Sequence, residues 1–188
     1  MNPSIGSNHS RMPSSILSAL LDVAAVSGIF LAGIGLPAAA AELGKPTGPV
    51  VLEIRGKLGV TNDGDMALFD LGMLEKLGLK TVKTSTVWTD GGARAFEGVL
   101  ARDVMAAVDA PNAKTVMARA LNDYAVEIPV ADFYRYDVIF AMRMDGQQLT
   151  ARDKGPLWVV YPRDDNPELQ DERIDQRWAW QVYKLEVN

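Results

Sequence analysis

A short run of charged residues beside an apolar segment is the first place in this sequence that could do chemistry. Arg152-Asp153-Lys154 precedes Gly155-Pro156, and the apolar run Leu157 to Tyr161 follows, ending at Pro162. Glycine and proline interrupt regular structure, and such an apolar run is typical of a strand buried on both faces. We therefore expect a cationic loop at the mouth of a core strand, suited to an anion or a polar heterocycle. A solvated loop before an ordinary strand explains the same residues equally well.

Two further candidate sites carry amide, carboxylate and aromatic groups. Asn122-Asp123-Tyr124 interrupts an alternating strand pattern, and Trp88 stands at the edge of a turn after a threonine-rich strand. The interruption favours a functional role for Asn122 and Asp123, although Asp123 could simply cap a turn. For Trp88 alone, core packing is a better explanation than ligand stacking.

The first 41 residues have the layout of a secretory signal peptide. Ile16 to Leu36 is apolar apart from Asp22 and two serines, and Pro37 to Ala41 supplies small residues for cleavage. We expect residues 1–41 to be removed on export to the periplasm, with residues 42–48 as a Gly/Pro linker and one domain over 49–188. An uncleaved membrane anchor is the alternative.

Removal of that segment restricts the chemistry of the mature chain. The chain has no cysteine, and its one histidine, His9, lies in the signal peptide. Catalysis by Ser-His-Asp or Cys-His groups is then excluded, as are the usual zinc, copper and haem ligands. These absences favour a protein that is not an autonomous enzyme. The net charge of −5 argues against a nucleic-acid partner.

The patterning predicts a mixed α+β domain dominated by β-sheet. Short alternating or β-branched runs predict strands, among them 79–87, 114–121, 126–130, 137–144 and 178–187. Apolar stripes predict short helices over 71–77 and 99–108, with one helical turn over 132–136. In this scheme Trp178 and Trp180 share a strand face and belong to the core.

Several of these segments resemble the oxidoreductase molybdopterin-binding domain, the superfamily with the sulfite oxidase fold. The resemblance is carried, in order, by Gly98 to Val104, Asn122 to Pro129, Asp137 to Ala141, Asp145-Gly146 and Gly155 to Pro162. Trp180 with Leu185 to Val187 matches the last strand of that family. It covers essentially the whole chain after the signal peptide.

The departures from the family concern the metal. Family enzymes ligate molybdenum with a cysteine about four residues before a tryptophan; here Trp88 is present, but Thr84 stands at the cysteine position. A hydroxyl is a poor ligand for this soft metal, so molybdenum is not expected. Lys154 stands where the family often has histidine, and Trp158 where it tends to have arginine.

The resemblance implies a pterin, possibly reduced, as the ligand. Asp123 with Asn122 would accept hydrogen bonds from the 2-amino/N3 edge of the pterin. Arg152 and Lys154, beside Gly155, would bind O4 or a phosphate tail. Trp88 and Tyr124 would stack on the ring. Small exported members of the superfamily are thought to bind pterins and to report to a membrane cyclic-di-GMP enzyme. Three functions follow: such a non-catalytic periplasmic pterin-binding protein, a molybdopterin oxidoreductase or subunit without the cysteine ligand, or a binding module for another anion or a protein.

Overall fold

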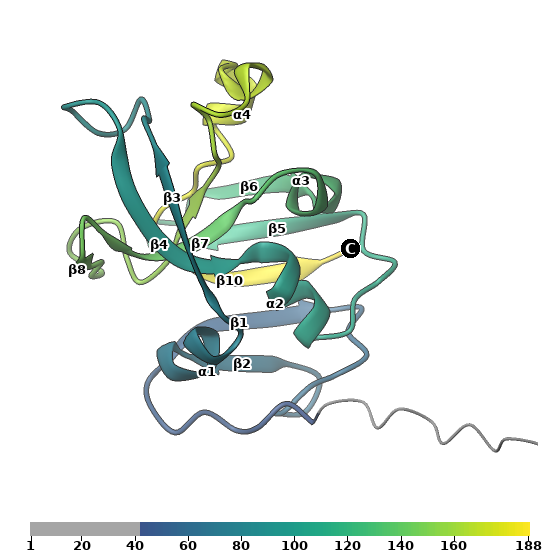
Figure 1. Cartoon of the computed structure of the whole chain (residues 1–188). Coiled ribbons are helices and arrows are strands. Elements are labelled where there is room, and N and C mark those ends of the chain that lie inside the picture. Colours follow the sequence, from purple (N-terminus) through teal and green to yellow (C-terminus); the bar gives the residue numbers. More distant parts are fainter. Residues whose placement is uncertain (1–41) are drawn as a thin grey trace, which may run out of the picture. The chain divides into compact units, whose positions relative to one another are not determined.

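The computed structural model describes residues 42–188, and the expected signal peptide lies outside the described residues. In this part of the chain, ten strands form two sheets joined by short helices (Figure 1). The strands are β1 (Val50–Gly56), β2 (Ala67–Asp70), β3 (Leu79–Thr84), β4 (Arg94–Leu100), β5 (Thr115–Ala120), β6 (Ala125–Pro129), β7 (Ile139–Met144), β8 (Gln147–Gln148), β9 (Trp158–Val160) and β10 (Val182–Val187). The helices are α1 (Leu71–Lys76), α2 (Ala101–Ala107), α3 (Val130–Arg135), the 3₁₀ turn η1 (Pro167–Leu169) and α4 (Glu172–Asp175).

The first sheet has the strand order β2-β1-β10-β5-β6. Its pairs are antiparallel except β1 with β10, which run parallel with Ile54 opposite Leu185. Alternate side chains along these strands are buried, including Val116 and Ala118 on β5. This two-residue period is what a sheet with one face against a core requires.

The second sheet has the order β3-β4-β7-β8, with β9 also paired to β7. At the register shift between Glu97 and Gly98, β4 approaches β7 so closely that a Cβ on Gly98 would lie 2.1 Å from the Phe140 carbonyl oxygen. Only glycine fits there. The sheet is therefore built around a backbone contact that no side chain can replace without moving a strand.

One hydrophobic core lies between the two sheets and the helices. It joins Ile54 of β1, Phe96 of β4 and Phe140 of β7, all fully buried. Phe133 of α3 meets Phe140 edge-to-face with 6.0 Å between ring centroids. Because the core uses both sheets, the loops at their ends are held in fixed relative positions.

The structure confirms the predicted α+β class and corrects some boundaries. The helix expected over 99–108 begins at Ala101, since Val99 and Leu100 complete β4. The strand expected over 79–87 ends at Thr84. The last strand begins at Val182 instead of 178, because Gln181 takes a left-handed conformation (φ 57°) that stops a strand.

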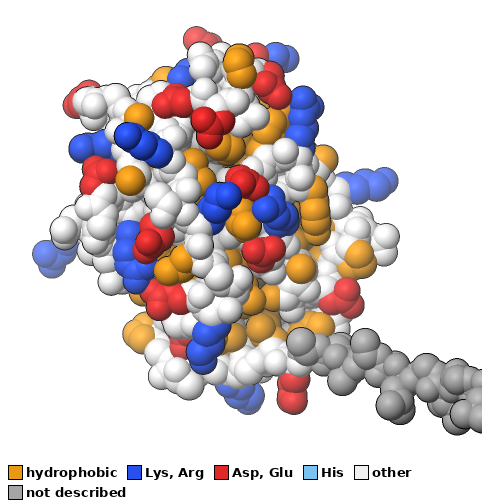
Figure 2. Space-filling view, viewed as in Figure 1, with side chains coloured by type: hydrophobic (Ala, Val, Ile, Leu, Met, Phe, Trp, Pro, Cys, Tyr) orange, Lys and Arg blue, Asp and Glu red, His pale blue; other side chains and the backbone are white. Residues whose placement is uncertain are grey.

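Charged side chains of both signs are interspersed on the face shown in Figure 2. Many charged side chains between residues 42 and 188 are paired, as where Asp137 meets both Lys80 and Arg102, at 2.9 and 2.8 Å. These two cations hold the pKa of Asp137 below its ordinary value through their hydrogen bonds. Between residues 42 and 188, the helices lack the length and apolar character needed to cross a bilayer.

Candidate functional site

A cavity of about 370 Å³ lies where three separate segments meet. Its lining residues come from the loop after β3, the β5–β6 connection and the segment between α4 and β10: Trp88, Asn122, Tyr124, Asp175, Gln176, Trp178 and Trp180. This volume falls in the usual range for small-molecule sites, and a mostly aromatic lining with a few polar groups is typical of them.

Three tryptophans contribute to the cavity wall. Trp88 packs edge-to-face on Trp180 with 5.1 Å between centroids. Behind them, the fully buried Trp158 lies 6.4 Å from Trp178 and 6.5 Å from Trp180. Rings packed in this way are rigid, so the wall offers preformed faces to a flat ligand.

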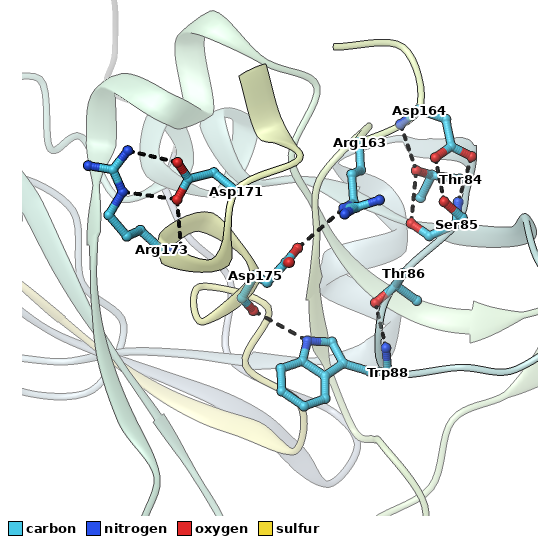
Figure 3. Close-up of polar contacts among 9 residues, drawn as sticks. All are labelled: Thr84, Ser85, Thr86, Trp88, Arg163, Asp164, Asp171, Arg173 and Asp175. Carbon is cyan, nitrogen blue, oxygen red and sulfur yellow. Dashed lines mark hydrogen bonds and ion pairs between the residues drawn. The ribbon is translucent and has the colours of Figure 1, made fainter. Parts of the chain in front are cut away.

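Hydrogen bonds on both sides fix Trp88 in the wall. Its backbone N–H donates to the Thr86 hydroxyl at 3.2 Å, and its indole N–H donates to the Asp175 carbonyl at 3.3 Å. Figure 3 shows the indole directed at Asp175, with Arg163 reaching the carboxylate of the same residue. The long loop after β3 is thereby tied to the end of α4.

The short helix α4 positions Asp175 and Gln176. The carboxylate of Asp171 caps its first turn, accepting from the Arg173 backbone N–H at 2.8 Å. The Arg173 guanidinium bonds the same carboxylate and holds the pKa of Asp171 well below its ordinary value (Figure 3). The charged form of Asp171 is therefore favoured, which suits a residue at a helix N-terminus.

An anchored ion pair holds the segment that follows α4. Arg177 meets Asp132 of α3 at 2.6 Å, and the buried Tyr161 hydroxyl donates to the same carboxylate at 2.9 Å. Burial raises the pKa of Tyr161 well above its usual value, so the phenol remains a donor. Trp178 therefore follows a residue that is tied to the core.

The β5–β6 connection brings two of the sequence-predicted residues to the cavity. The Asn122 side-chain oxygen accepts from the Tyr124 backbone N–H at 3.1 Å, and the Tyr124 hydroxyl donates to the Gln176 carbonyl at 2.7 Å. Burial raises the pKa of Tyr124, which keeps this donor protonated. Asp123, in contrast, is an exposed turn residue with φ of 65°, outside the cavity lining.

The cationic loop before β9 contributes to the wall indirectly. The ammonium of Lys154 lies 4.3 Å from the centroid of Trp180 and 5.1 Å from that of Trp158. Arg152 is exposed, lies outside the cavity lining and forms no ion pair within residues 42–188. Gly155 is buried, and a Cβ there would lie 2.4 Å from the Leu149 carbonyl carbon. Glycine is thus required by close backbone approach, not by positive φ.

Thr84 lies beside the cavity residues but not in the lining. It is fully buried, accepts from the Asp164 backbone N–H at 3.1 Å and donates to the Ser85 carbonyl at 3.3 Å. The Asp164 carboxylate binds the Ser85 backbone N–H and hydroxyl (Figure 3). Residues 42–188 hold no cluster of three or more His, Cys, Asp or Glu side chains placed to hold a metal. Within that part of the chain, the Thr84 hydroxyl is thus already paired both as donor and as acceptor.

Four lining residues were not among the sequence-predicted ones: Asp175, Gln176, Trp178 and Trp180. Asp175 and Gln176 stand in a polar stretch of the sequence, and the two tryptophans were expected on a core-facing strand. Two tryptophans directly after a polar turn were the available signal. Of the predicted residues, the structure brings Trp88, Asn122 and Tyr124 together, with Lys154 against the wall.

Some polar groups of the cavity remain available to a ligand. The Asp175 Oδ1 accepts from Arg163 at 3.3 Å, whereas its Oδ2 has no protein partner in the described part of the chain. The indole nitrogen of Trp178 is buried and likewise unpartnered there. Leaving such a donor unpaired costs on the order of 1–3 kcal/mol. The cavity lining thus includes a nearly buried acidic residue and a tryptophan whose indole N–H is unsatisfied within residues 42–188.

Comparison with known proteins places the fold. Residues 75–164 match the family model described as the oxidoreductase molybdopterin binding domain. The crystal structure of the sulfane dehydrogenase SoxCD from Paracoccus pantotrophus is similar over 72% of this chain, with a TM-score of 0.52 and 17% identity. This chain covers 37% of the SoxCD chain. No curated protein matches.

The matched segment runs from α1 to the loop after β9 and includes Thr84, Trp88 and the whole second sheet. The likeness to SoxCD at this identity concerns the fold, which is the sulfite oxidase type. The family match over residues 75–164 and the shared fold together support the resemblance to the oxidoreductase molybdopterin-binding domain superfamily that the sequence carries.

Proposed function

We propose that the tryptophan-lined cavity binds a pterin-type heterocycle without molybdenum and that the protein is a non-catalytic pterin-binding protein. The observation that carries this proposal is the composition of the cavity wall: three tryptophans, a tyrosine and Asp175, which is 8% exposed. A pterin is flat, so aromatic faces suit its rings, and its 2-amino/N3 edge donates hydrogen bonds that a carboxylate accepts. Asp175 takes the role that the sequence had suggested for Asp123.

The environment of Thr84 supports a ligand without metal. Both hydrogen-bonding functions of the hydroxyl are already used, by Ser85 and Asp164. The carboxylate of Asp164 adds negative charge next to that position. The position of the family's cysteine ligand is therefore occupied by already paired oxygen groups.

We further propose that the protein acts in the periplasm and relays pterin levels to a membrane cyclic-di-GMP signalling enzyme. Support comes from the signal-peptide layout of residues 1–41 and from the resemblance of the sequence to small exported superfamily members. Val87 and Leu121, each next to a cavity residue in the chain, are 57% and 50% exposed. Apolar side chains beside a ligand site suit a partner that senses whether the site is filled.

The alternative is a molybdopterin-dependent oxidoreductase or a subunit of one. The family description names oxidoreductases, and the similar solved structure is a dehydrogenase. In that case Thr84 and Asp164 would have to rearrange before the metal could be held, because their hydrogen bonds occupy the position now.

The experiment is to purify the protein from its own host and identify what accompanies it. We expect a fluorescent pterin in the denatured extract and no molybdenum in proportion to protein. About one molybdenum per chain would favour the oxidoreductase, and the absence of binding when reduced and oxidised pterins are titrated would refute the pterin proposal.

A further inference from the structure

The cavity lining is rich in aromatic rings and contains no positively charged side chain. Four of its seven lining residues are aromatic, namely Trp88, Tyr124, Trp178 and Trp180. Asp175 is the only lining residue with a formal charge, and no Lys or Arg from residues 42–188 is among them. The faces of aromatic rings are electron-rich and attract cations. A lining of this kind suits a ligand that carries a positive charge.

The indoles of this cluster already attract a cation from the chain itself. The Lys154 ammonium lies 4.3 Å from the centroid of Trp180 and 5.1 Å from that of Trp158. Lys154 is not one of the lining residues, and no Lys or Arg in the described part of the chain lies over the other three lining rings. Those rings can therefore receive a cation from outside.

The acceptors that surround the cavity are largely in use. The Asp175 carbonyl accepts from the Trp88 indole, and the Gln176 carbonyl accepts from the Tyr124 hydroxyl. The Asp175 carboxylate forms an ion pair with Arg163 at 3.3 Å. A primary ammonium brings three N–H donors, and leaving them unpaired on transfer from water is costly. A quaternary ammonium has no N–H and presents only methyl groups, so it loses no hydrogen bond on entering the cavity.

We propose that the cavity binds small solutes with a quaternary ammonium group, such as choline, through cation–π contacts with its indole and phenol rings. This inference goes beyond the proposed function, because it requires neither a pterin nor hydrogen bonds to one. Aromatic cages of this composition are a general solution for binding quaternary ammonium groups. Because both classes of ligand use the same rings, a pterin and a quaternary ammonium ion compete for the cavity.

The test compares three ligands by calorimetric titration of the purified full chain, with no pterin present. Choline, its carbon isostere 3,3-dimethylbutanol and ethanolamine share the same hydroxyethyl tail. The isostere has the shape of choline without the charge, and ethanolamine has the charge with N–H groups in place of methyl groups. We expect choline to bind at least about fivefold more tightly than either of them.

Substitutions of Trp88 then test whether an aromatic face carries the preference. Trp88→Leu keeps an apolar side chain without a ring, so choline should lose affinity while the carbon isostere keeps its own. Trp88→Phe restores a ring face and should restore most of the preference for choline. Tyr134→Leu is the matched control, because Tyr134 is an exposed aromatic residue outside the lining, and it should change neither affinity.

Lys154→Met gives a response of opposite sign. Removing the ammonium takes a like charge away from the same cluster and frees the Trp180 ring. Choline should therefore bind at least about twofold more tightly to this variant, whereas the uncharged isostere should not gain. A residue that only supported the wall would weaken both ligands together when it was replaced.

The outcomes separate this inference from the proposed function. If the carbon isostere or ethanolamine binds as tightly as choline, the cavity does not select a quaternary ammonium group and the inference is wrong. Choline binding with no response to any pterin would leave the inference standing and refute the pterin-binding function, and the converse result would do the reverse. Unchanged choline affinity in Trp88→Leu would also overturn the proposed cation–π contacts. Should that variant fail to fold, the ligand ranking of the parent and the response of Lys154→Met decide.

Discussion

Replacing Lys154 by methionine distinguishes a residue that binds ligand from one that supports the cavity wall. The sequence suggested that the ammonium meets O4 or a phosphate of a pterin. In the structure it lies 4.3 Å from the Trp180 centroid and 5.1 Å from the Trp158 centroid. Methionine keeps the unbranched apolar chain and removes only the charge, so it tests the charge in isolation.

The expected loss of stability follows from these two contacts. A cation over an aromatic face contributes about 0.5–1 kcal/mol where it is partly solvated. Two rings share one ammonium, so the total for Lys154→Met is about 1 kcal/mol. For a domain of this size, that lowers the unfolding midpoint by roughly 3 °C.

Thermal unfolding and ligand titration are measured on the same preparations. Lys154→Arg should retain most of the stability, because a guanidinium also stacks on indole. Arg152→Met is the matched control, since Arg152 is exposed and forms no ion pair in the described part of the chain, and it should change neither property. For Lys154→Met we expect uncharged and phosphorylated pterins to lose affinity by the same small factor.

One result would refute this reasoning. If Lys154→Met unfolds at the parent temperature yet binds phosphorylated pterins several-fold more weakly than plain ones, the ammonium leaves the tryptophans and contacts the ligand. The interpretation from sequence would then be correct, and the cation–π contacts would be incidental.

Four further predictions concern stability, export and metal. Asp70→Ala should cost about 2 kcal/mol, since the carboxylate accepts from the backbone N–H groups of Thr47, Gly48 and Met73 at 2.7–2.8 Å. Those bonds hold the pKa of Asp70 below its ordinary value of 3.8. The carboxylate therefore stabilises the fold fully above that value, and this stabilisation is lost as the pH falls through the lower pKa of the folded state. Urea unfolding at neutral pH and at about pH 3 should show a smaller difference in stability between parent and variant at the lower pH. Gly155→Ala should destabilise the fold by roughly 1–3 kcal/mol, because the new Cβ would clash with the Leu149 backbone. Gly44→Ala has open space around it and should leave the stability measured by urea unfolding unchanged. A chain that starts at Glu42 should remain in the cytoplasm and fold, since it needs no disulfide; cell fractionation checks this, and an insoluble product would make the apolar N-terminus part of the fold. Metal analysis of protein from the native host should find far less than one molybdenum per chain, with or without added molybdate during growth.

Much of the fold follows from local patterns in the sequence. Alternation along Thr115–Ala120 and the apolar run before Pro162 mark which faces are buried, because a strand repeats every two residues whatever surrounds it. The absence of cysteine, and of histidine beyond residue 9, restricts the available chemistry without any structure. Asn122 and Tyr124 were found because they interrupt a regular pattern, which is a local signal.

Tertiary packing alone decided which carboxylate serves the cavity. Asp123 and Asp175 both stand in polar stretches of sequence, yet the first points from an exposed turn and the second is 8% exposed against Arg163 and the Trp88 loop. Trp178 and Trp180 alternate like strand residues. They line the cavity because the left-handed Gln181 ends the strand pattern after them and the ion pair of Arg177 holds the segment before them. Sequence periodicity reports the environment of a residue relative to its own strand or helix. The meeting of loops from β3, β5–β6 and α4 depends on how two sheets pack over one core, which no local pattern encodes.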